Sequence, residues 1–185
     1  MKKLKFYSAS NIDQLSSPEE VQNYSLETPA LDFFTDFTKT KPLVIESSIS
    51  AVDVGKLMIK SHVRMKIVIN ENNQFMGVVS TEDLIDRKIM QQLSKGDKRE
   101  DILVTEMMKT KNQLVALDFT ELTKATISDV IDLLKDSGTQ HCLVVDRTNN
   151  CLRGIFSASD ISRKLHLSID IQDKSSFYKV FSAID

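Results

Sequence analysis

An internal duplication constrains the fold of this chain more than any other feature of its sequence. The segment AVDVGKLMIKSHVRMKIVI, Ala51–Ile69, aligns without a gap with ISDVIDLLKDSGTQHCLVV, Ile127–Val145. After one additional residue in the second copy, MGVVSTED aligns with RGIFSASD, so that a glycine, a serine and an aspartate recur at the same spacing. Because repeated sequence indicates repeated structure, we predict a fold built from two copies of one unit.

Each copy predicts the same series of elements. A short apolar run, Leu43–Ile45 or Leu114–Leu117, indicates a strand. Apolar residues at helical spacing follow Ser50 or Thr126, two residue types that favour a helix N-cap. Two further strand-like runs flank the turn sequences NENN and DRTNN and predict a hairpin.

A second helix is expected at the Ser-x-x-Asp turn that ends each copy. It would begin at Ser80 in the first copy and at Ser157 in the second, and reach to about Gln92 and Leu165. The unit is then β-α-β-β-α, which places the chain in the α/β (α+β) class. Since a unit of about 60 residues is near the lower size limit for an independent core, the two copies should stack on each other.

Composition narrows the organisation into domains. We expect an N-terminal extension over residues 1–38 that is partly flexible, a first repeat over 39–95, a polar linker over 96–106, a second repeat over 107–167 and a C-terminal tail over 168–185.

The ends of the chain carry two apolar segments. LDFFTDF, with Phe33, Phe34 and Phe37, should pack as a helix on the first repeat. FYKVFSAI, residues 177–184, is too apolar for a free tail and should cover either its own core or a second protomer.

Charge and residue usage exclude several classes of function. With 24 Lys and Arg against 26 Asp and Glu, the chain has no overall basic field, so neither nucleic acid nor a membrane surface is an expected partner. The basic start lacks the apolar region of a secretory signal, which favours a cytoplasmic location. The two cysteines and three histidines lack metal-ligand spacing, so no metal is expected. No catalytic motif is present, and we do not expect an enzyme.

The duplicated order of elements and the two Gly-hydrophobic-hydrophobic-Ser-x-x-Asp turns resemble the cystathionine-β-synthase (CBS) domain family, present as a stand-alone tandem pair, or Bateman module. VTEMMKTKNQLVAL is similar to the opening of a repeat in that family, and the likeness covers about Lys39 to Leu167. It implies two repeats packed about a pseudo-twofold axis, two clefts that bind AMP, ADP, ATP or S-adenosylmethionine in many members, and a homodimer.

The resemblance also implies roles for particular side chains. The aspartates of the two turns would take the ribose hydroxyls, and polar positions that lead into each hairpin would face phosphate. The candidate ligand-binding residues are Ser80, Asp83, Ser157, Asp160, Arg64 and His141.

A purely local explanation of the turns competes with ligand binding. Serine at an N-cap with aspartate three residues later forms a capping-box pair, which needs no ligand. Glu82 adds a second carboxylate to the first turn and opposes phosphate there, unless Arg64 or Lys66 offsets it, so we favour the second turn, around Asp160.

Basic side chains near the turns have ordinary alternatives too. Taken one at a time, Arg64, Lys66 and Arg153 are predicted to be solvated surface charges. His141 is either a phosphate contact or a half-buried strand residue.

Two functions are consistent with these features. The first is a regulatory sensor of an adenosine nucleotide that needs no other cofactor and acts on an effector protein. The second is a ligand-free dimerisation or scaffold module whose turns only cap helices. Which adenosine ligand binds, whether one or both clefts are used, and which effector protein responds are left open by the sequence.

Overall fold

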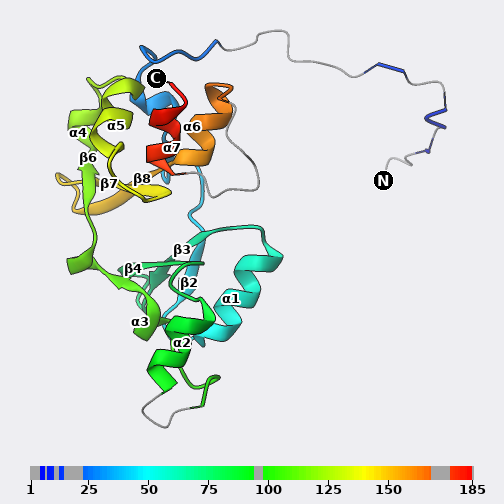
Figure 1. The fold of residues 1–185 in the computed structure, drawn as a ribbon, viewed down its shortest axis with the longest axis vertical. Coiled ribbons are helices and arrows are strands. Elements are labelled where there is room, and N and C mark those ends of the chain that lie inside the picture. Colours follow the sequence, from blue (N-terminus) through cyan, green and yellow to red (C-terminus); the bar gives the residue numbers. More distant parts are fainter. Residues whose placement is uncertain are drawn as a thin grey trace.

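The computed structural model describes residues 5–6, 8–10, 13–14, 23–93, 98–167 and 176–184. Figure 1 shows two halves stacked along the long axis, each with a sheet and its own helices. The predicted mixed class of helices and sheets in two repeats is thereby confirmed. None of the described helices has the length and apolar character required to cross a membrane.

Both repeats follow the predicted order of elements. The first contains β2 (Val44–Glu46), α1 (Ala51–Lys60), β3 (Met65–Ile69), β4 (Phe75–Ser80) and α2 (Asp86–Leu93). The second contains β6 (Ala116–Asp118), α5 (Ile127–Leu134), β7 (His141–Asp146), β8 (Cys151–Ser157) and α6 (Ala158–Lys164). Ser50 and Thr126 accept hydrogen bonds from the backbone N–H groups of Asp53 and Asp129, as expected of N-caps.

Shorter elements complete the described chain. They are the 3₁₀ turn η1 (Ala30–Asp32), β1 (Thr35–Asp36), α3 (Val104–Met107), β5 (Lys109–Thr110), the 3₁₀ turn η2 (Lys111–Gln113), α4 (Phe119–Leu122) and α7 (Phe177–Ser182).

The two sheets exchange their edge strands. The strand orders are β2-β3-β4-β5 and β1-β8-β7-β6. β1 precedes the first repeat but pairs with β8 of the second, and β5 precedes the second repeat but pairs with β4 of the first. Each half is therefore completed by a strand that leads into the other, which ties the two halves together.

This exchange explains the glycine of the repeated motif. A Cβ atom at Gly154 would clash with the carbonyl oxygen of Thr35 in β1, and one at Gly77 would clash with the carbonyl oxygen of Lys109 in β5. Only glycine lets the exchanged strand approach this closely.

Each hairpin is buried on both faces of its sheet. One face of each sheet packs on the helices of its own repeat, with Val68 and Val144 among the buried residues. The opposite faces meet between the repeats in a cluster formed by Ile67, Val78, Leu143 and Ile155. Burial on both sides accounts for the continuous apolar runs in these strands.

Two expectations about secondary structure were wrong. The second helix of the first repeat begins at Asp86, because residues 81–84 form a hydrogen-bonded turn that closes on Ser80. The LDFFTDF segment forms η1 and β1, and Phe33 is buried in the core of the second repeat, because β1 pairs with β8.

The C-terminal segment covers the chain's own core. Phe177 and Val180 of α7 are fully buried in the same cluster as α5 and α6 residues. Of the two surfaces that this segment was expected to cover, the structure shows it on the chain's own core.

Candidate ligand-binding site

A cavity of about 500 Å³ lies between the two repeats. The segment that enters β2, with Thr40, Lys41 and Pro42, forms one wall. The loop from α1 to β3, with His62 and Arg64, forms another. A volume of this size is within the range of small-molecule sites, about 300–1,000 Å³.

The second repeat contributes an acidic group to this cavity. Asp160 lies in the first turn of α6 and lines the cavity, and its Oδ1 accepts a hydrogen bond of 2.9 Å from Arg163 Nη2. No described residue bonds its other carboxylate oxygen, Oδ2. Ser157 and Ser159 also line the cavity, with their hydroxyls 2.8 Å apart. The predicted capping pair between Ser157 and Asp160 does not form.

The equivalent carboxylate of the first repeat is engaged locally. Asp83 is only 4% exposed; its Oδ2 accepts hydrogen bonds from the backbone N–H of Ser80 at 2.9 Å and from its hydroxyl at 2.6 Å. Lys88 Nζ donates to Oδ1 at 3.1 Å. Neither Ser80 nor Asp83 lines the cavity.

These contacts also set the charge of Asp83. Burial raises the pKa of the Asp83 carboxyl, but the hydrogen bonds from Ser80 and Lys88 outweigh it and hold the net pKa below its ordinary value. A charged carboxylate with both oxygens occupied has little capacity left for a ligand.

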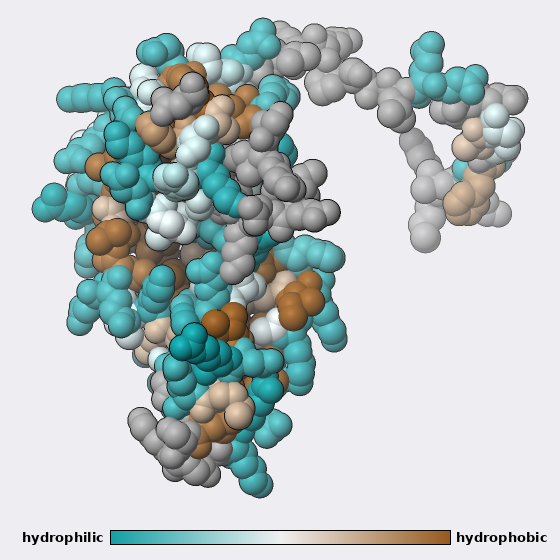
Figure 2. Space-filling view, viewed as in Figure 1, coloured by the Kyte–Doolittle hydropathy of each residue, from teal (hydrophilic) through white to brown (hydrophobic). Residues whose placement is uncertain are grey.

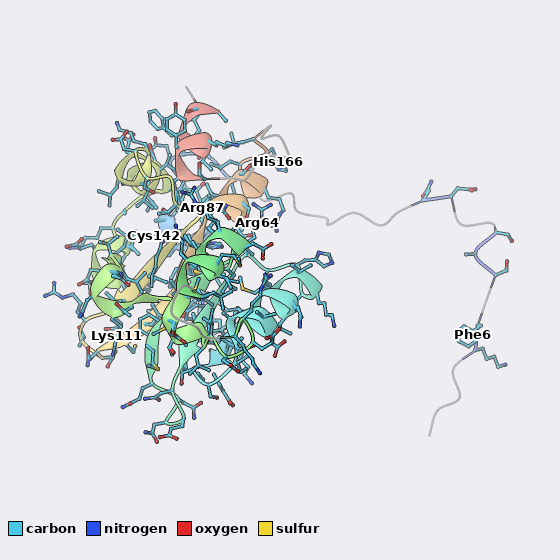
Figure 3. All side chains as sticks on the ribbon, turned by 60° about the horizontal axis from the view of Figure 1, so that its bottom comes forward. Phe6, Arg64, Arg87, Lys111, Cys142 and His166 are labelled. Carbon is cyan, nitrogen blue, oxygen red and sulfur yellow. The ribbon has the colours of Figure 1, made fainter. Side chains whose placement is uncertain are left out.

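Basic side chains line the same cavity as Asp160. Lys41, His62 and Arg64 line it from the first repeat (Figure 3 labels Arg64), and Arg64 is exposed. His141 lines it from the start of β7 and is half-buried. Burial lowers the pKa of His141; Asp160 raises it and Arg64 lowers it, and the net direction is downward. The imidazole is therefore neutral at physiological pH.

Two basic residues are not the solvated charges that the sequence indicated. Lys66 is only 7% exposed, because it lies on the face of β3 opposite Ile67 and points toward the helices of its own repeat. This orientation turns it away from the cavity, which it does not line.

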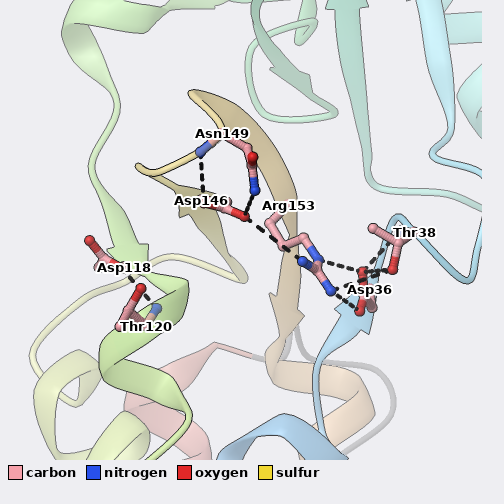
Figure 4. Close-up of polar contacts among 7 residues, drawn as sticks. All are labelled: Asp36, Thr38, Asp118, Thr120, Asp146, Asn149 and Arg153. Carbon is pink, nitrogen blue, oxygen red and sulfur yellow. Dashed lines mark hydrogen bonds and ion pairs between the residues drawn. The ribbon is translucent and has the colours of Figure 1, made fainter.

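Arg153 forms an ion pair that anchors β1 (Figure 4). Its Nε and Nη2 donate to the two carboxylate oxygens of Asp36 at 2.8 and 2.9 Å. Asp146 lies 3.9 Å from Nη1, and the guanidinium stacks 4.2 Å from the centre of the Phe119 ring. The paired charges and the ring hold Asp36 in place, so Arg153 fixes the segment that brings Thr35 and Phe37 to the cavity.

The sequence did not single out some cavity residues. Lys41 and His62 line the cavity but come from segments outside the repeated turn. His62 follows the end of α1 closely and has a positive φ of 52°. Because this backbone conformation is uncommon for residues other than glycine, the sequence does not predict it at a histidine.

Comparison with known proteins identifies a family. The sequence matches the CBS domain over residues 34–89 and 104–167. A search of curated proteins gave no match.

Three solved structures share this fold. An uncharacterized conserved protein from Pyrococcus horikoshii has a TM-score of 0.56 and 19% identity, over 80% of this chain and 98% of that chain. The structure of CBSX2, a protein from Arabidopsis thaliana, in complex with AMP has a TM-score of 0.54 and 23% identity, over 74% of this chain and 94% of that chain. A CBS domain protein of unknown function from Thermoplasma acidophilum has a TM-score of 0.51 and 18% identity, over 82% of this chain and 76% of that chain.

Proposed function

Because the chain belongs to the CBS domain family, we propose that its cavity binds an adenosine nucleotide and that the chain is a regulatory module that acts on an effector protein. Proteins with paired CBS domains are typically regulatory and non-catalytic. The observation that carries the proposal is the carboxylate of Asp160, which faces the cavity with one oxygen unbonded by any described residue.

Each part of a nucleotide has a matching group. A carboxylate accepts two hydrogen bonds from vicinal hydroxyls, so Asp160 would hold the ribose, with Ser157 and Ser159 beside it. Lys41 and Arg64 would meet the phosphates. The apolar lining, which includes Pro42 and Ile155, would cover the base.

The charge of the lining favours one class of adenosine ligand. The sulfonium group of S-adenosylmethionine is cationic and would face Lys41 and Arg64 at a cost in binding free energy. AMP, ADP and ATP carry the opposite charge. We therefore propose a phosphorylated nucleotide, and the structure of CBSX2 with AMP supports this choice for a protein of the same fold.

The position of the cavity provides a regulatory mechanism. Its lining comes from both repeats, so a bound nucleotide contacts both at once and favours the arrangement in which those contacts fit. An effector protein would respond to that arrangement. Self-association of the chain stays a prediction from the family resemblance.

A structural role fits the first turn. The contacts of Asp83 with Ser80 and Lys88 account for that carboxylate without a ligand. A module whose two turns are both structural would bind no nucleotide, and this is the ligand-free scaffold alternative.

Isothermal titration of the full chain with AMP, ADP, ATP and S-adenosylmethionine tests the proposal. We expect a phosphorylated nucleotide to bind, and Asp160→Ala to weaken it by about tenfold or more, since hydrogen bonds to a charged group contribute about 1.5–3 kcal/mol each. Asp132→Ala is the matched control, because it removes an exposed carboxylate on α5 that does not line the cavity. If none of the four ligands binds, or Asp160→Ala binds as well as the wild type, the sensor proposal is wrong.

A further inference from the structure

Residues 23–29, which we call the N-terminal arm, rest on the second repeat. The backbone N–H groups of Ile127 and Ser128 donate to the arm's carbonyl oxygens at Thr28 and Leu26, at 2.9 and 3.1 Å. Both N–H groups lie in the first turn of α5, where a helix offers them no partner of its own. The arm therefore caps α5, and it lies outside the region that matches the CBS domain, which begins at residue 34.

The arm is held less firmly than the core that follows it. Its residues alternate between exposed and half-buried, whereas Ala30, the next residue, is fully buried. A hollow of about 410 Å³ borders the arm at Asn23, Tyr24 and Thr28. Figure 2 shows hydrophobic and hydrophilic atoms interspersed at this end of the molecule, where Figure 1 draws α7. A segment with few buried contacts opens locally at a lower free energy than the core does.

Lys164, the last residue of α6, fastens the arm to that helix. Its Nζ lies 5.1 Å from the centre of the Tyr24 ring and 5.5 Å from that of Phe33. It also donates a hydrogen bond to the carbonyl oxygen of Asp32. Because a lysine ammonium is attracted to the faces of aromatic rings, these contacts hold the arm and η1 together against α6.

The same face of α6 reaches the nucleotide cavity. Asp160 precedes Lys164 by four residues, so the two side chains lie on one face of the helix, one turn apart. The chain that continues from the arm also reaches the cavity, through Thr35 and Lys41. A nucleotide that contacts Asp160 and Lys41 would therefore join the same two parts of the chain that Lys164 joins.

We propose that a nucleotide in the cavity strengthens the docking of the N-terminal arm on the second repeat, and that the arm reports occupancy of the cavity to the effector protein. This inference rests on the proposed function and adds the element that responds. A ligand that fixes α6 relative to the chain beside it lowers the entropic cost of ordering the arm between them. Such coupling is reciprocal, so arm docking favours nucleotide binding by the same factor.

Hydrogen exchange of the full chain, followed by NMR, tests this coupling. The amides of Ile127 and Ser128 report arm docking, because their hydrogen-bond partners are arm carbonyls. We expect saturating AMP, ADP or ATP to slow their exchange by about fivefold or more. The amide of Ala51, which is equivalent to Ile127 in the first repeat, is the matched control. It donates to the carbonyl oxygen of Ile102 at 2.8 Å, so its exchange should not change.

A variant of the arm tests the reciprocal effect. Tyr24→Ala removes a ring that Lys164 contacts, leaves the charge of the chain unchanged and alters no residue that lines the cavity. We expect faster exchange at the two reporter amides and nucleotide binding that is weaker by about threefold or more. Tyr178→Ala is the matched control, because it removes an exposed tyrosine ring of α7 that does not line the cavity. It should bind nucleotide as the wild type does.

The outcomes separate this inference from the proposed function. If a nucleotide binds but the reporter amides do not slow, or slow no more than Ala51 does, the inference is wrong and the proposed function stands. Tyr24→Ala that binds nucleotide as tightly as the wild type would overturn the inference in the same way. If no nucleotide binds at all, the proposed function fails and this inference fails with it.

Discussion

Arg153 shows how one side chain links an edge strand to the cavity. Its two bonds to Asp36 hold β1 against β8, and the residues on either side of Asp36 line the cavity. The pairing holds the pKa of the Asp36 carboxyl well below its usual range, chiefly through the hydrogen bond from Arg153. The carboxylate is therefore charged in the folded state down to strongly acidic pH.

We predict that Arg153→Met lowers the Tm at neutral pH, because it leaves the Asp36 carboxylate, whose side chain is 11% exposed, without its cation. Arg153→Lys should fall between this variant and the wild type, since it keeps the charge but loses the two-pronged geometry. Thermal unfolding followed by circular dichroism measures both. Equal Tm values for the wild type and Arg153→Met would contradict a structural role for the pair.

His141 predicts a pH dependence of stability. Burial lowers its pKa in the folded chain, whereas the unfolded chain keeps the ordinary value of 6.5. As the pH falls below about 6.5, the unfolded state takes up a proton that the folded state resists, so the free energy of unfolding decreases.

We expect His141→Gln to remove this contribution. Denaturant unfolding at pH 7.5 and pH 5.5, values chosen about one unit either side of 6.5, should show a larger loss of stability in the wild type than in the variant. An equal loss in both would mean that the imidazole titrates as it does in water.

The position of a residue was predictable where the repeat itself carries it. The duplicated turn predicts that Asp160 faces the gap between the repeats, and it lines the cavity there. The sequence favours Asp160 over Asp83 because of Glu82, whereas the structure gives a different reason, since both oxygens of Asp83 already accept hydrogen bonds. The burial of Lys66 and the ion pair of Arg153 were not predictable, because each depends on which face of a strand a side chain takes or on a partner far away in the sequence.

At the scale of elements, the exchanged strands distinguish this fold from two simple copies side by side. Periodicity located the helices and hairpins, but β1 and β5 are two residues long and leave no pattern. The aromatic segment at Phe33 and Phe34 was therefore placed on the wrong repeat. The sequence shows Gly77 and Gly154, which leave room for these strands, but it does not show the strands themselves.

Gly154→Ala tests the exchange directly. A methyl group there would clash with the Thr35 carbonyl and the Phe34 ring, so we expect a loss of about 1–3 kcal/mol in the free energy of unfolding. Gly138→Ala is the matched control, because a Cβ atom there would meet nothing within 4 Å, and its effect should stay within about 0.5 kcal/mol. Chemical denaturation measures both. Similar stabilities for the two variants would mean that β1 does not contact β8 closely at Gly154.

At the scale of the whole molecule, two similar halves have acquired different roles. The second repeat presents its turn aspartate to the cavity and covers its helices with α7. The first repeat closes its aspartate locally, supplies basic residues to the shared cavity and leaves Ile59 of α1 exposed. The stacking of the halves followed from the size of the repeat, but this asymmetry depends on side-chain contacts that the alignment of the copies does not contain.

Because of this asymmetry, the number of bound nucleotides tests the proposed site most directly. AMP is titrated into the full chain, its Asp160→Ala variant and its Asp83→Ala variant, and the ligand bound at saturation is counted. We predict one nucleotide per chain in the wild type, the same number in Asp83→Ala with a lower Tm, and loss of binding in Asp160→Ala. Two nucleotides per chain, or binding that depends on Asp83 and survives the loss of Asp160, would contradict it.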